Sequence, residues 1–240
     1  MTLRPARATR EHDLPVRDSD VVAGSPQPLR SDAQRNRESI LIAAAATFDE
    51  LGLNAPAEQI ARRAGVGSAT LYRHFPTRRE LVETAFGDDV NEMRQAFEDA
   101  VNIKDAWQAF AGLLEQLFAL QARNRGLSDL MTIRFPSTPT LAGAGGRSRE
   151  LVGRVVTRAQ QAGELRADFA ETDLPALLWA NARIIEATRY EASGAWRRFL
   201  AFTLDGLRAE NAHPTDQPPL STDQARAAML VLGREAGVAD

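Results

Sequence analysis

The sequence contains no cysteine and only three histidines, His12, His74 and His213, which stand far apart. Without cysteine the chain forms no disulfide and offers no thiolate, and scattered histidines do not indicate a metal cluster. The sequence also lacks an apolar run of the ~18 residues that a membrane span needs, and its N-terminus lacks the apolar core of a signal peptide. We therefore expect a cytoplasmic protein that binds no metal, carries no cofactor and makes no membrane contact.

Motifs of catalysis and nucleotide binding are missing as well. The sequence has no P-loop, no GxGxxG motif, and no convincing spacing of a nucleophile, a base and an acid. The run GAGG at residues 143–146 is too loose for a phosphate-binding loop and is typical of a flexible loop. An enzyme is therefore disfavoured.

Positive charge is concentrated in one short segment. The formal net charge is −3, yet the first 80 residues carry a slight excess of basic residues and the remainder an excess of acidic ones. Between Glu58 and Arg79 the only acidic residue is Glu58, and the basic residues are Arg62, Arg63, Arg73, Arg78 and Arg79. This distribution argues against a general nucleic-acid coat and leaves room for one localised basic surface.

The chain opens with an arm followed by a helix. Residues 1–30 mix charges with several prolines and show no apolar periodicity, which predicts a disordered arm. Ser31 and Gln34 have the form of a capping box, and apolar residues then recur at helical spacing as far as Leu51.

Two short helices are expected next, followed by a third that continues past Gly87 to about Val101. One follows Pro56, which suits a first helical turn, and Gly65 closes it. Another occupies "VGSATLYRHF" and ends before Pro76, because the residue before a proline avoids helical geometry. Thr77 with Glu80 forms a second capping box that opens the next helix.

Beyond residue 87 the pattern stays helical, without a period-2 strand, so we expect an all-α protein. A loop is expected over residues 135–146, a proline-rich break after residue 210 and a weak terminal helix before residue 240. Further helices are expected near 107–121, 127–133, 147–162, 173–192 and 194–210.

Two short helices joined by AGVG, residues 64–67, have the spacing of a helix-turn-helix. In the DNA-binding form of this motif the second helix enters the major groove, and neighbouring helix ends contact phosphates. Phosphate contacts position the protein, whereas contacts to base edges select a sequence. We assign base readout to Ser68, Ala69 and Tyr72, and backbone contact to Thr70, Arg73, His74 and Arg78. The alternative is an ordinary surface helix that exposes the same side chains without binding DNA.

Residues 35–86 resemble the DNA-binding domain of the tetracycline-repressor (TetR) family of transcriptional regulators. The resemblance rests on ILIAAAATFDELGL, IARRAGVG and TLYRHFPTRREL, in this order and at the family's spacings. Thr70, Tyr72, His74 and Arg78 match positions that commonly touch DNA in that family. Gly67 departs from the usual serine, which weakens the helix cap.

The resemblance implies a homodimeric regulator, usually a repressor, that binds a palindromic double-stranded operator and leaves it when a small molecule binds. It implies a three-helix DNA-binding domain over residues 31–86 and a larger ligand-binding and dimerisation domain over residues 87–210. The C-terminal helices are similar to those of an SbtR-like subgroup. A constitutive DNA-binding dimer without an effector and, less favoured, a helical enzyme are the alternatives.

The second half offers candidates for the dimer interface and the ligand pocket. The helices within residues 173–210 carry more large apolar residues than one inward stripe requires, so we expect a homodimer interface there, with a larger monomer core as the alternative. Ligand pockets are mostly apolar with a few polar groups. Our candidates for the pocket, each of which is otherwise core or a surface ion pair, are Trp107, Phe110, Phe118, Met131, Trp179 and Arg183.

Overall fold

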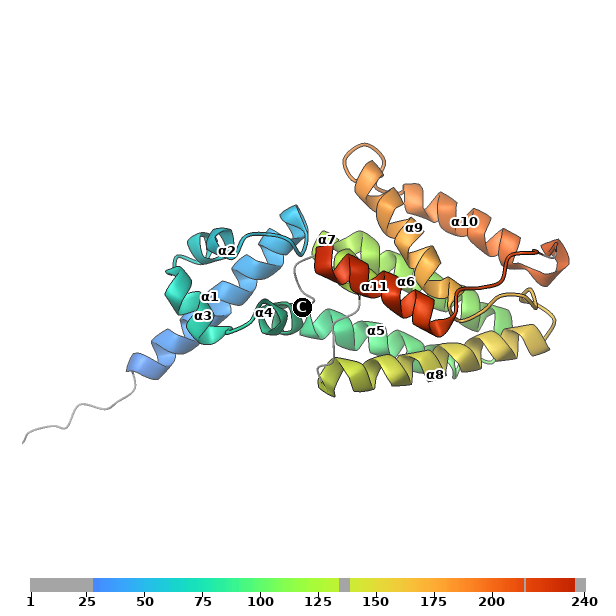
Figure 1. Ribbon diagram of the computed structural model, residues 1–240, viewed down its shortest axis with the longest axis horizontal. Helices are drawn as coiled ribbons and strands as arrows, with labels where there is room; N and C mark the ends of the chain where they lie inside the picture. Colours follow the sequence, from blue (N-terminus) through green and yellow to red (C-terminus); the bar gives the residue numbers. More distant parts are fainter. Residues whose placement is uncertain (1–27, 134–138, 214, 236–240) are drawn as a thin grey trace, which may run out of the picture.

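The computed structural model describes residues 28–133, 139–213 and 215–235, and within these ranges the chain forms helices and no strand. The expected all-α fold is confirmed. The helices are α1 (Pro28–Leu51), α2 (Ala57–Arg63), α3 (Ser68–His74), α4 (Arg78–Ala85), α5 (Gly87–Ala100), α6 (Ala106–Arg123), α7 (Arg125–Thr132), α8 (Pro139–Gln161), α9 (Asp173–Thr188), α10 (Ala195–Leu207), a short 3-10 helix η1 (Ala209–Asn211) and α11 (Thr222–Glu235). Helices α1–α4 form one end of an elongated molecule and α5–α11 the other (Figure 1).

Local signals set the ends of the N-terminal helices. Gly52 and Gly65 adopt φ values of +76° and +71°, a left-handed conformation that glycine accepts without steric cost, and these residues follow the ends of α1 and α2. The Thr77 hydroxyl accepts a hydrogen bond from the Glu80 N–H at 3.1 Å and caps α4. Gly67 precedes α3 without a side-chain cap.

The N-terminal helices do not close their own core. Their buried side chains include Ile40, Phe48 and Phe75, and Leu120 and Leu127 from α6 and α7 complete the same cluster. The domain at the N-terminal end is therefore packed directly onto the bundle, instead of being joined to it only through the chain after α4.

A second core lies within the bundle, around α6. This helix is buried along its length and packs against α5, α8, α9 and α10. The rings of Phe118 on α6 and Phe199 on α10 stack with their centroids 5.8 Å apart. Among the described helices, none combines the length and the apolar character needed to cross a membrane.

Several expected boundaries differ from the structure. Helix α1 begins at Pro28, so Ser31 lies inside it and the predicted capping box does not start it; proline suits a first helical turn because its missing N–H would have no partner there. Residues 139–146 belong to α8, although a loop was expected over 135–146; Pro139 opens this helix in the same manner. Residues 134–138 and most of the expected arm, residues 1–27, lie outside the described residues.

The contact between α7 and the N-terminal core gives the first prediction. A Cβ atom on Gly126 would lie 2.7 Å from Phe48 Cβ and 2.7 Å from the Phe86 ring, so Gly126→Ala forces the helices apart. We expect a loss of about 1–3 kcal/mol in the free energy of unfolding, measured by denaturant titration.

Gly112→Ala on α6 is the matched control. Nothing lies within 4 Å of the Cβ that it would add. Because alanine favours a helix over glycine, we expect this change to stabilise the protein by about 0.5–1 kcal/mol. Equal stability of the two variants would contradict the close packing described for α7.

Candidate functional site

Helices α2 and α3 present one exposed surface at the N-terminal end of the molecule. Leu71 and Phe75 on the inner side of α3 are buried. Ser68, Ala69 and Arg73 on the other side are exposed, and the Tyr72 side chain is 48% exposed. The last two residues of α2 are the exposed arginines Arg62 and Arg63. We call the surface formed by Arg62, Arg63, Ser68, Ala69, Tyr72 and Arg73 the α3 face; it carries three arginines, of which Arg63 is paired with Glu50 of α1 at 2.8 Å.

Thr70 and His74 are less accessible than expected. Both are half-buried. The His74 carbonyl accepts a hydrogen bond from Arg37 Nη1 at 3.2 Å, and the Arg37 guanidinium lies 4.3 Å from the centre of the Phe75 ring. Arg37 on α1 thus fixes the end of α3, a role that α1's sequence pattern does not reveal.

Arg78 is turned into the protein. Its Nε donates to the Leu53 carbonyl at 2.9 Å, and its Nη2 donates to the carbonyls of Leu53 and, at 2.5 Å, Ala55. Burial lowers the pKa of this guanidinium from its ordinary value, and the nearby Tyr72 and Glu58 oppose that shift. Arg78 therefore holds the loop between α1 and α2, and we replace its expected phosphate contact with this structural role.

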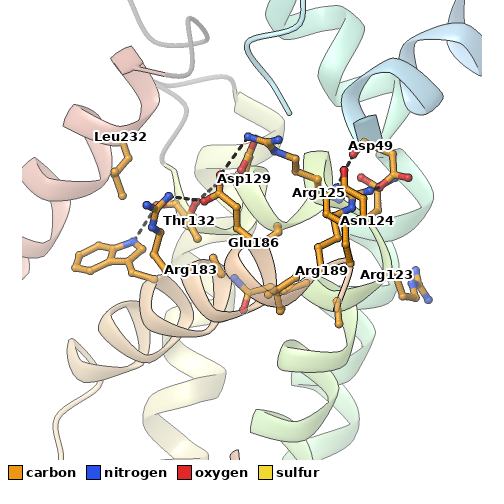
Figure 2. Close-up of a pocket in the computed structure, with 17 residues that line it drawn as sticks. Asp49, Arg123, Asn124, Arg125, Asp129, Thr132, Arg183, Glu186, Arg189 and Leu232 are labelled. Atoms are coloured by element: carbon orange, nitrogen blue, oxygen red, sulfur yellow. Dashed lines mark hydrogen bonds and ion pairs between the residues drawn. The ribbon is translucent and has the colours of Figure 1, made fainter. Parts of the chain in front are cut away.

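A cavity of about 310 Å³ lies where α1, α6, α7 and α9 meet (Figure 2). Seven of its seventeen lining residues are charged: Asp49, Arg123, Arg125, Asp129, Arg183, Glu186 and Arg189. The apolar part of the wall includes Trp179, Ile185 and, from α11, Leu232. Trp179 Nε1 donates to the Thr132 carbonyl at 3.0 Å, which fixes the indole ring at the wall.

The wall of the cavity also joins the two ends of the molecule. Arg189, the residue that follows α9, donates to the Asp49 carbonyl at 2.9 Å and to Asp49 Oδ1 at 3.0 Å. The same Oδ1 accepts the Arg125 N–H at 3.0 Å, at the start of α7. The three residues thus connect the end of α1 to α7 and α9 through groups that border the cavity.

Asp129 makes a second connection. Its Oδ2 accepts the Leu53 N–H at 2.9 Å, so α7 holds the loop whose carbonyls Arg78 holds from α4. Burial raises the pKa of the Asp129 carboxyl above its ordinary value, while the Leu53 N–H and the charge of Arg125 oppose that rise. Asp129 is thus partly desolvated and committed to the loop.

Comparisons with known proteins agree on one family. Residues 40–85 match the model for bacterial regulatory proteins of the tetR family, and residues 105–209 match the C-terminal domain of SbtR-like transcriptional regulators. A TetR transcription regulatory protein from Mycobacterium vanbaalenii is 32% identical, and the match covers 75% of this chain and 99% of that one, with a TM-score of 0.42. The chain belongs to the TetR family.

One curated relative matches part of the chain, and a further solved structure shares its fold. An HTH-type transcriptional regulator of Staphylococcus aureus is 35% identical over 82 residues, which is 34% of this chain. That match spans only 43% of the relative's length. The ketosteroid transcriptional regulator KstR2 of Mycobacterium tuberculosis shares the fold, with a TM-score of 0.52 at 20% identity over 72% of this chain and 94% of that one.

The residues expected to bind a ligand in this TetR-family chain are divided between two places. Trp179 and Arg183 line the cavity. Trp107, Phe110 and Phe118 are buried in the second core, and Met131 is half-buried where the two cores meet. The void beside Phe110 measures about 10 Å³ and is too small for a ligand.

Sequence reasoning missed most of the charged wall. Asp49 and Asp129 lie on helices that carry ordinary amphipathic patterns, and their partners are more than 70 positions away in the chain. The buried amide pair beneath the wall, in which Asn181 Nδ2 donates to Gln121 Oε1 at 2.9 Å, is a similar long-range contact. The surface ion pair that was the alternative role of Arg183 is present, and its partner is Glu186.

The revised role of Arg78 gives the second prediction. Arg78→Ala leaves the Leu53 and Ala55 carbonyls without their donor, so we expect the free energy of unfolding to fall by about 1–3 kcal/mol. Arg73→Ala, at an exposed position five residues earlier, should change it by less than about 0.5 kcal/mol. Denaturant titration of both variants measures the difference. If the Arg78→Ala variant is as stable as the parent, the structural role given to Arg78 is wrong.

Proposed function

We propose that this TetR-family protein is a sequence-specific DNA-binding regulator that acts as a homodimeric repressor and leaves its operator when a small molecule binds. The α3 face carries the proposal. Its small residues Ser68 and Ala69 stand at the front of the helix, where they let the backbone approach the floor of a major groove. Tyr72 follows as a donor to base edges, and Arg62, Arg63 and Arg73 supply charge for phosphates.

The division of labour on this face is narrower than the sequence suggested. Ser68, Ala69 and Tyr72 retain the proposed role in base readout because they are exposed on one helix face. Arg73 is the proposed phosphate contact of α3, whereas Thr70 and His74 are only partly accessible. His74 contributes mainly through its backbone, which holds Arg37.

Helices α9 and α10 supply the proposed homodimer interface. They cover α6 with one side and leave large apolar side chains on the other, among which Phe202 is 61% exposed. Leu177, Ile184 and Leu204 pack on the bundle core but remain partly accessible. A C2 dimer buries the same patch of both subunits, so it removes this apolar surface from water. It also sets two copies of α3 at the spacing of successive major grooves.

The interdomain cavity is the proposed effector site. Its volume lies at the small end of the range for ligand pockets, and it combines an indole wall with convergent charges. A ligand there contacts Arg125 and Arg189, which also hold Asp49 of α1. A ligand that takes the Arg189 guanidinium competes with its contact to Asp49, which helps to fix the N-terminal domain, and this gives the ligand a physical route to the position of α3.

The third prediction concerns DNA. On a duplex selected from a random library, Arg73→Ala should weaken binding to all duplexes alike and lower the slope of log affinity against log salt by about one unit, because one phosphate contact is lost. Arg147→Ala, an exposed arginine on α8, is the control and should change neither. Fluorescence anisotropy across a salt series measures both quantities. If the library yields no preferred duplex, the proposal that the protein is a sequence-specific regulator is wrong.

The fourth prediction concerns the dimer. Phe202→Glu places a charge in the proposed apolar interface and should convert the dimer to a monomer, as measured by light scattering after size exclusion. Ile42→Glu is the control, because Ile42 on α1 is 73% exposed but lies away from α9 and α10. If both variants kept the parent's mass, the interface would lie elsewhere.

A further inference from the structure

Glu186 on α9 is shared by two arginines of the cavity. Its Oε1 accepts from Arg125 Nη2 at 3.3 Å, and its Oε2 accepts from Arg183 Nη1. Arg183 precedes Glu186 by one turn of α9, while Arg125 comes from the start of α7, so the two guanidinium groups approach the carboxylate from different helices (Figure 2). The single carboxylate of Glu186 is therefore paired with two guanidinium groups.

The other charged groups of the wall have partners of their own. Arg123 is paired with Asp89 and Glu92, which lie outside the cavity, and Arg189 is paired with Asp49. Asp129 carries the remaining carboxylate, and its Oδ2 is bonded to the Leu53 N–H. Arg125 and Arg183 are therefore the two guanidinium groups of the wall that share one carboxylate, that of Glu186.

The bond between Arg183 and Glu186 is easily exchanged. The Arg183 side chain is 81% exposed and that of Glu186 is 42% exposed, and ion pairs with such access to water contribute little stability. Within the described part of the chain, Glu186 is the only hydrogen-bonding partner of the Arg183 side chain. A guanidinium group offers five N–H donors in a planar fork that fits a carboxylate, so most of its capacity is unused.

An apolar wall stands next to this exchangeable pair. Trp179 lies one turn before Arg183 on α9 and is held by its bond to Thr132. Leu232 of α11 approaches the same end of the cavity as Arg183 (Figure 2). The indole and this leucine therefore give the cavity two apolar surfaces near the two arginines.

We propose that the cavity takes a small organic carboxylate. The carboxylate replaces Glu186 between Arg183 and Arg125, and the apolar body packs against Trp179 and Leu232. This inference rests on the proposed role of the cavity as the effector site, but binding of the acid is a property of the protein alone and is measured without DNA.

The test compares isosteric ligands of different charge. Phenyl, 2-naphthyl and octyl scaffolds, each as the carboxylate, the neutral carboxamide and the cationic amidine, are titrated into the full chain by calorimetry. For at least one scaffold the carboxylate should bind about tenfold more tightly than the carboxamide, and the amidine most weakly, because a charge-assisted bond is replaced by a neutral one and then by repulsion.

Two variants and one control test whether the ligand's carboxylate binds at Arg183 in place of Glu186. Arg183→Gln should weaken binding of the carboxylate about tenfold without changing that of the carboxamide. Glu186→Gln should tighten binding of the carboxylate severalfold, because the internal competitor loses its charge. Arg147→Gln on α8 removes a similarly exposed arginine outside the cavity and should leave all affinities unchanged.

Several results would overturn the inference: no carboxylate binds, the three charge states bind alike, Arg183→Gln has no effect, or Glu186→Gln fails to tighten binding. The outcome is separable from that of the proposed function. A carboxylate that binds in this way but does not release DNA leaves the inference standing and contradicts the proposed effector role. If the protein binds DNA selectively but binds no carboxylate, the inference is wrong and the proposed DNA-binding function stands.

Discussion

The structure depends on how the loop after α1 is held. Leu53 donates its N–H to Asp129 of α7 and offers its carbonyl to Arg78 of α4, so one residue of this loop is bonded to both ends of the molecule. Its side chain is fully buried, as is that of Phe48, one turn earlier in the core. Because buried backbone groups are costly to leave without partners, the loop fixes the orientation of α1 relative to α7. The position of α3 follows, since α3 packs on α1.

This arrangement links the proposed effector cavity to the proposed DNA-binding surface, the α3 face. Asp49 lies at the end of α1, just before the loop, and Arg125 and Arg189 hold it from the cavity wall. No long chain of couplings is required, because the residues that would meet a ligand are bonded directly to the helix that carries the DNA-binding domain. A few kcal/mol of competition at these bonds is the usual scale of coupling between two sites.

The sequence predicted those parts of the fold that depend on neighbours in the chain. The cap formed by Thr77, the left-handed glycine at position 65 and the helix-turn-helix spacing are local signals, and the structure confirms them. The direction of Arg78 was beyond sequence reasoning, because an arginine in a first helical turn fits a phosphate contact and an inward bond equally well. The charged wall was missed for a related reason: Asp49 and Arg189 are 140 positions apart, and no local pattern connects them.

The most direct test of this account is a double-mutant cycle between Asp49 and Arg189, with Asp49→Asn, Arg189→Gln and the double variant. Affinity for a selected operator duplex is measured for all four proteins, with circular dichroism to establish that each is folded. If the contact between Asp49 and Arg189 positions the DNA-binding domain, each single change should weaken DNA binding. The double variant should then bind DNA no more weakly than the weaker-binding single variant, with a coupling of about fivefold or more. Strictly additive effects, or affinities that do not change at all, would contradict the claim that the cavity wall controls the α3 face.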